Sequence, residues 1–180
     1  VPGFDVKELF RPAAAAWFSV DIIENVSMEA FYQWKWEKTE IPVSGSFFAS
    51  NDYAGIGGNG AEIGFGRCPE NSAPGACGFA FGGSNIPRRD DIEPDDGGQY
   101  GVAFNWFAEQ LNETEFGFYY ANYHSRLPLF SGNAVVVPGV PGTGGVSVQY
   151  PEDIKLYGMS FNTPLPGGWV LQGEYSRKED

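Results

Sequence analysis

The stretch that decides the fold of this chain is Val26-Ser-Met-Glu-Ala-Phe-Tyr-Gln-Trp-Lys-Trp-Glu-Lys38. Apolar and polar side chains alternate along it, and Phe31 is the one break in the pattern. Because successive side chains of a β-strand point to opposite faces, this alternation gives one apolar face and one polar face. A helix would scatter both tryptophans and the charges around its circumference. The stretch therefore predicts an amphipathic β-strand.

The same alternation predicts six strands, at about residues 14–22, 26–38, 99–107, 114–125, 154–162 and 169–176. The connections between them are alternately short and long, with long loops at about 39–98 and 126–153. This arrangement puts all the turns at one end of an antiparallel sheet and all the long loops at the other. Outer-membrane barrels have such an asymmetry, with short periplasmic turns and long extracellular loops.

We therefore expect an all-β chain, an antiparallel meander of about six strands, in which residues 1–180 are a single segment of a larger transmembrane β-barrel. Small closed barrels need about eight strands. No start methionine or signal peptide precedes Val1, so the chain is expected to be an excerpt from a longer precursor. A soluble antiparallel sandwich or lipocalin-like barrel would show the same alternation and stays an alternative.

The composition excludes several classes of protein. The aromatic share is 16%, and there are 25 glycines among 180 residues, which suits strands and turns better than helices. No run of about 18 apolar residues is present, so no transmembrane helix is expected. The net charge of −12 disfavours contact with phosphate backbones, so we expect no nucleic-acid partner. No cofactor is expected either.

Each predicted strand offers one face to lipid and one to a lumen. The predicted lumen-lining residues share a polar side chain on the polar face: Glu29, Gln33, Lys35, Glu37, Gln99, Asn105, Glu115, Gln172 and Glu174. The predicted aromatic girdle and lipid face consist of Trp34, Trp36, Tyr100, Trp106, Phe116 and Trp169. Carboxylates outnumber the one lysine in the lumen set, which predicts a wet, mildly cation-favouring passage. The same face also carries the aromatic residues Phe31, Phe107, Tyr119 and Tyr123. They suit a ligand with apolar surface, and packing against an inserted loop or plug is the alternative.

Two further features lie in the long first loop. Cys68 and Cys77 bracket a stretch of turn-forming residues and are predicted to form a disulfide, which implies an oxidising compartment. A metal pair is the weaker alternative, because two ligands are too few. Residues 90–96 are acidic and are predicted to be a solvated loop. A calcium site formed by Asp90, Asp91, Asp95 and Asp96 is the sharper, weaker alternative, since no EF-hand spacing is present.

His124-Ser125-Arg126 is the one place that suggests catalysis. Neighbouring strand residues point to opposite faces, so His124 and Ser125 are poorly placed to share a proton, and no third member is evident. We expect no catalytic residues and no enzyme. We expect instead a polar strand end at the outer membrane surface, with Arg126 meeting a lipopolysaccharide phosphate or a loop carboxylate.

Four motifs occur in the same order as in a known family. They lie within residues 9–40, 97–103, 111–117 and 123–128, the first containing Met28-Glu-Ala-Phe-Tyr-Gln-Trp-Lys-Trp36 and the last reading Tyr123-His-Ser-Arg-Leu-Pro128. Together they resemble the DUF1302 family of Gram-negative bacteria. The resemblance implies a larger outer-membrane barrel, discussed as a porin-like channel for hydrophobic compounds, with a substantial part of the barrel outside this segment. It implies no catalytic residues and no particular substrate.

We therefore expect a channel in the Gram-negative outer membrane for passive uptake of small solutes, with hydrophobic compounds among the candidates. Its partners would be outer-membrane lipid, lipopolysaccharide and the solute. The alternative is a non-transport barrel that serves as an anchor and whose long surface loop binds a partner. A membrane-embedded hydrolase or acyltransferase is a third class, to which no residue pattern points.

Overall fold

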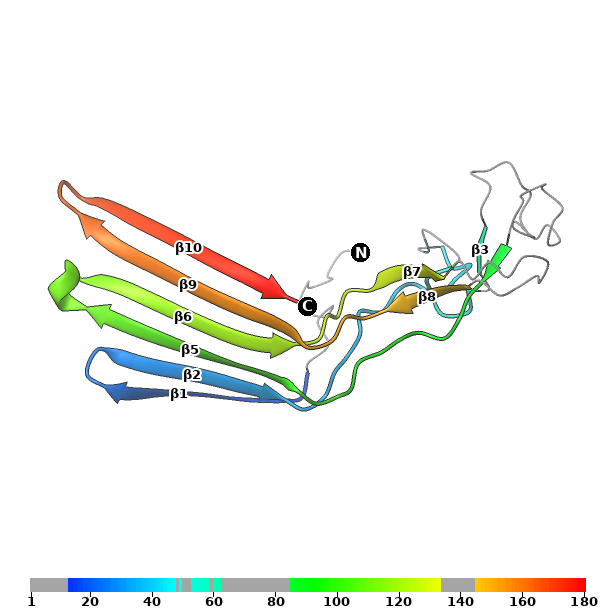
Figure 1. Ribbon diagram of the computed structural model, residues 1–180, viewed down its shortest axis with the longest axis horizontal. Helices are drawn as coiled ribbons and strands as arrows, with labels where there is room; N and C mark the ends of the chain where they lie inside the picture. The colour runs from blue at the N-terminus through cyan, green and yellow to red at the C-terminus, as the bar shows by residue number, and fades with distance from the viewer. Residues whose placement is uncertain (1–12, 48, 50–52, 59, 63–84, 134–144) are drawn as a thin grey trace. The chain divides into compact units, whose positions relative to one another are not determined.

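The computed structural model describes residues 13–47, 49, 53–58, 60–62, 85–133 and 145–180 (Figure 1). These residues fall into two compact units. The sheet unit comprises the described residues of 1–37, 94–126 and 151–180. The loop unit comprises those of 38–93 and 127–150. Each unit is described separately below.

The sheet unit is one antiparallel sheet of six strands, in the order β1-β2-β5-β6-β9-β10 (Figure 1). The strands are β1 (Ala15–Ile23), β2 (Val26–Gln33), β5 (Gln99–Ala108), β6 (Thr114–Tyr123), β9 (Ile154–Leu165) and β10 (Trp169–Glu179). Each strand pairs with the strand before it in this order, so the sheet is a meander. The predicted all-β fold and six-stranded antiparallel meander are confirmed.

The short connections are built by residues that accept a left-handed backbone. Asn25, in the turn between β1 and β2, has a φ of 65°, and Asn is one of the few side chains that tolerate it. Gly167 and Gly168 make the turn between β9 and β10 with φ values of 84° and 81°. A 3₁₀ turn, η2 (Glu109–Leu111), joins β5 to β6. All three connections lie at one end of the sheet, called here the turn end, and residues 34–98 and 124–153 leave from the other, the loop end.

The second strand is shorter than predicted, because β2 ends at Gln33 rather than near residue 38. Beyond this point the backbone leaves the ladder with β5. The Trp34 amide donates to the Ala14 carbonyl at 3.1 Å, and the Trp36 amide donates to Asp96 Oδ1 at 3.1 Å. The alternation of apolar and polar residues in the sequence thus continues to Lys38, whereas hydrogen bonds to other parts of the chain end the strand at Gln33.

The loop unit contains short strands that the sequence pattern did not predict. Strand β3 (Gly60–Glu62) pairs with β4 (Asn85–Pro87), and β7 (Leu129–Asn133) pairs with β8 (Gly145–Gln149). Strand β8 is also bound on the side of Arg89 and Ile92, whose amides donate to the Val146 and Val148 carbonyls at 2.8 Å. Strands this short, set among glycine and proline, do not produce a recognisable period.

Few apolar side chains are buried in the described part of the chain. The buried ones are Trp36, Ala54, Ala108, Val148 and Tyr150. Among the described residues no second layer packs on the six-stranded sheet, so these residues give it no hydrophobic core of the usual kind. Among the described residues no helix is long and apolar enough to cross a membrane.

Candidate functional site: the two faces of the sheet

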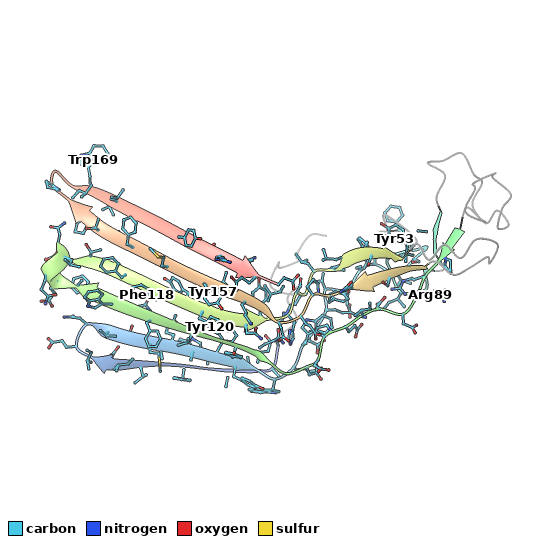
Figure 2. All side chains as sticks on the ribbon, in the orientation of Figure 1. Tyr53, Arg89, Phe118, Tyr120, Tyr157 and Trp169 are labelled. Atoms are coloured by element: carbon cyan, nitrogen blue, oxygen red, sulfur yellow. The ribbon has the colours of Figure 1, made fainter. Side chains whose placement is uncertain are left out.

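One face of the sheet is apolar across all six strands. Strand register places Val20, Met28, Phe104, Phe118, Met159 and Tyr175 in one continuous row, because residues opposite one another in an antiparallel pair share a face. Phe104 is 38% exposed and Tyr175 is 62% exposed, so the described residues do not cover this row. Figure 2 shows Phe118 and Tyr157, two side chains of this face. The apolar residues that alternate along each strand are thus aligned by the register into one apolar surface.

Aromatic side chains lie at both ends of this apolar face. Near the loop end the Tyr120 ring lies 6.1 Å from Tyr100 and 5.2 Å from Tyr157, measured between centroids. Toward the turn end Trp106 stacks on Phe116 at 5.4 Å. Such bands are found where barrels meet the two membrane interfaces. Of the predicted girdle residues, those on the apolar face by register are Tyr100, Trp106, Phe116 and Trp169.

The two other predicted girdle residues follow β2. Trp34 is 51% exposed, but Trp36 is only 7% exposed and does not lie on the apolar face. The Trp36 indole donates from Nε1 to the Ser125 carbonyl at 3.2 Å, and its amide binds Asp96. The prediction that Trp36 faces lipid assumed that β2 continues to residue 38, which it does not.

His124 is the centre of a buried polar cluster at the loop end of the sheet. The Asp153 amide donates to Nδ1 at 3.0 Å, and Nε2 donates to the Gly97 carbonyl at 2.6 Å. Both ring nitrogens are thus bonded to backbone groups, one just before β5 and one just before β9. The His124 side chain is buried, because the residue is only 4% exposed. A base that activates a nucleophile needs a free ring nitrogen. His124 is therefore a buried structural contact.

The polar face carries most of the predicted lumen residues. Register joins Asp21, Ser27, Asn105, Gly117, Ser160 and Glu174 in a row across the six strands. The predicted residues on this face are Glu29, Gln33, Gln99, Asn105, Glu115, Gln172 and Glu174. Lys35 and Glu37 lie beyond β2, where they form an ion pair at 2.5 Å. Gln99 is 3% exposed and accepts from the His124 amide at 3.4 Å, so it belongs to the buried cluster.

Toward the turn end the polar face is hollowed. The hollow has a volume of about 1020 Å³ and unites four of the predicted residues, namely Asn105, Glu115, Gln172 and Glu174. Further polar lining residues that were not predicted are Asp21, Glu24, Asn25, Ser27, Ser160 and Asn162. A signal for them existed, because Asp21, Ser160 and Asn162 alternate with apolar neighbours within predicted strands. Only the register shows that they adjoin the predicted set.

An aromatic ring that lines this hollow lies across the polar face, where glycines leave room for it. Tyr119 is opposite Gly158 in the ladder, and a Cβ atom at Gly158 would stand 3.3 Å from Tyr119 Cδ2. A Cβ atom at Gly117 would meet the Tyr119 hydroxyl at 2.2 Å. That hydroxyl and Ser160 Oγ are hydrogen-bonded at 3.0 Å. Phe31 lies over Gly101 in the same way. Cross-strand pairs of glycine and an aromatic ring pin the register of a sheet.

The remaining predicted sites are in or near the loop unit. In the described residues, no three side chains of the metal-binding types gather into a group. Asp91 accepts from Arg88 at 2.6 Å and lies 3.5 Å from Lys38 Nζ, and Asp96 accepts from the Trp36 amide. Arg126 donates to Gln33 Oε1 at 3.4 Å. The predicted disulfide between Cys68 and Cys77 lies outside the described residues.

The family model DUF1302, described as a protein of unknown function, matches residues 1–180. No curated protein and no solved structure matches the chain.

Proposed function

This chain belongs to the DUF1302 family, and from that premise we propose that its sheet is part of a closed β-barrel in the outer membrane of a Gram-negative bacterium. The observation that carries the proposal is the apolar face, which spans six strands and is left exposed by the described residues. Burying a face of this size is strongly favourable, at about 25 cal/mol per Å² of apolar surface. Lipid is the medium that covers such a face while leaving the opposite face wet.

The dimensions and edges of the sheet support this placement. The six strands are 8 to 12 residues long, and a tilted membrane strand needs about 9–11. In the described residues the outer edges of β1 and β10 pair with no other strand. Unpaired edges are costly in a membrane, where only closed barrels satisfy every backbone group. Further strands therefore complete the barrel between these edges.

In this barrel the polar face lines the lumen, and the protein is a porin-like channel for passive uptake of small solutes. The carboxylates and amides of the hollow keep the lumen wet, while Tyr119, Phe31 and Phe107 offer apolar surface to hydrophobic solutes. The outer leaflet supplies lipopolysaccharide as a neighbour of the aromatic band at the loop end. We propose no enzymatic activity, since the ring nitrogens of His124 are already bonded to the backbone.

Single-channel conductance of the full-length protein in a planar bilayer tests this function. We expect stepwise conductance, which increases when residues 45–95 are deleted, if that segment narrows the passage. Detergent carrying no protein gives the baseline, and the shift in gel mobility on heating verifies that each form is a folded barrel. Persistent silence of both folded forms would contradict the channel.

A second candidate function is a barrel anchor whose loop unit binds a partner. The loop unit is compact and has its own paired strands. It also exposes apolar side chains, among them Phe47 at 96%, Ile56 at 64% and Leu129 at 57%. Silence of verified barrels, together with loss of partner binding on deletion of residues 45–95, would favour this function over transport.

A further inference from the structure

We propose that the hollow at the turn end of the polar face selects solutes that combine a positive charge with a flat apolar group, such as aromatic ammonium ions. This inference rests on the proposed channel and deepens it by naming the class of solute. Three features of the hollow carry it: its charge, an unused hydrogen-bond acceptor and its aromatic rings.

The charge of the lining is negative throughout. Four carboxylates line the hollow, namely Asp21 from β1, Glu24 from the β1–β2 turn, Glu115 from β6 and Glu174 from β10, and no lysine, arginine or histidine is among the lining residues. None of the four forms an ion pair in the described part of the chain. Carboxylates without a cationic partner attract cations and repel anions.

The positive side chains of the sheet unit are all remote from the hollow. They are Lys35, Arg126, Lys155, Arg177 and Lys178 among the described residues. Register places the last three at the loop end, where Lys155 is opposite Glu179 and Arg177 is opposite Tyr157. The turn end therefore has no internal counter-ion in the described chain, and a cationic solute can supply one.

One acceptor atom in the lining lacks a donor. Asn162 Oδ1 accepts no hydrogen bond, while the Asn162 amide nitrogen donates to Glu115 Oε2 at 3.4 Å. A buried acceptor without a donor is costly. An ammonium group has several N–H donors and no acceptor, so it matches a lining made of carboxylate, amide and hydroxyl oxygens.

Aromatic rings give the site its apolar part. Tyr119 lines the hollow and is held by its hydrogen bond to Ser160, and Phe107 lines it from β5. A cation near the face of an aromatic ring gains further attraction, and a flat apolar group can stack on such a ring. An aromatic anion such as a carboxylate would meet the same rings but would be repelled by the four carboxylates.

The test measures the reversal potential of the full-length protein in a potassium chloride gradient, and the block of its current by phenethylammonium and by phenylacetate. We expect cation preference, with block by phenethylammonium at much lower concentration. One carboxylate about 4 Å from the cation in a wet site changes binding about five-fold, so Glu115→Gln with Glu174→Gln should weaken block about 25-fold. The effect should shrink in 1 M salt.

The matched control is Glu152→Gln, which removes the same charge from an exposed residue near the start of β9, outside the hollow. It should leave the block by phenethylammonium unchanged. A conducting channel that prefers anions, or in which the double variant behaves as the parent protein, would overturn this inference and leave the channel function intact.

A silent but folded barrel would overturn the channel function instead. Titration calorimetry of the same protein in detergent would then measure whether the hollow binds each probe. Binding of phenethylammonium but not phenylacetate, weakened by the double variant, would support the inference, whereas equal binding or no binding of the two probes would overturn it.

Discussion

Hydrogen bonds to distant parts of the chain fix the positions of His124 and Trp36. His124 bonds to the backbone of Gly97 and Asp153, and Trp36 bonds to Asp96 and to the Ser125 carbonyl. These residues tie the segments that leave β2 and β6 to those that enter β5 and β9. The cluster therefore closes the loop end of the sheet.

At this scale we predict that His124→Phe destabilises the sheet unit by about 1–3 kcal/mol, because the Gly97 carbonyl and the Asp153 amide lose their partners in a partly buried place. Urea unfolding of the full-length protein in detergent measures the loss. Tyr123→Phe is the matched control, since no hydrogen bond of the Tyr123 hydroxyl is present in the described residues. Hydrogen exchange at the Asp153 amide should become faster in His124→Phe, and unchanged exchange there would contradict the role of the histidine.

At the scale of elements, each strand separates an apolar from a polar set of side chains, and the register aligns these sets across the sheet. Trp106 lies on the apolar face, opposite Val26 and Phe116, whereas Trp17 lies on the polar face, opposite Phe31. Both are substantially exposed, at 40% and 64%. Exposure alone does not distinguish them, but the face does.

This difference predicts opposite responses to a lipid-borne quencher. Two single-tryptophan variants of the full-length protein, one retaining Trp106 and one retaining Trp17, are refolded into vesicles that contain brominated lipid. We expect quenching of Trp106 and little quenching of Trp17, because bromine in the acyl chains reaches only the lipid-facing side. Equal quenching of the two, or quenching of Trp17 alone, would refute the assignment of the apolar face to lipid.

At the scale of the whole molecule, the loop unit has its own ionic contacts, between Lys38 and the carboxylates of Asp91 and Glu93. Lys38 is hydrogen-bonded to Glu93 and lies near Asp91, and these contacts raise the pKa of Lys38 above its ordinary value of 10.5. Tyr150 is 4% exposed, and burial raises the pKa of its hydroxyl above 10.0. Both groups favour the protonated form in the folded unit.

A raised folded pKa means that each group's contribution to stability is complete below the unfolded pKa and is lost as the pH rises through the folded value. We therefore expect the loop unit to open as the pH rises above about 10. Protection factors for the Ile92 and Tyr150 amides, which are hydrogen-bonded in this unit, measure the opening after correction for base-catalysed exchange. Tyr150→Phe should retain more protection at high pH than the parent protein. An identical pH profile in the two would show that Tyr150 does not contribute.

The sequence by itself determined the six strands of the sheet and their two faces, because a period of two needs only local geometry. It also located the short turns, since Asn25, Gly167 and Gly168 accept a left-handed backbone wherever they occur. Family membership followed from motifs in the same order.

Tertiary structure alone decided where β2 ends. Trp36 lies outside the strand because it is hydrogen-bonded to residues 60 and 89 positions away in the sequence. It alone joined Asp21, Glu115 and Glu174 in one hollow, since strand register, a non-local property, brings them together. The burial of His124 has the same origin. The hydrogen-bond partners of His124 are backbone groups of distant segments. Every residue type has such groups, so the sequence does not reveal them.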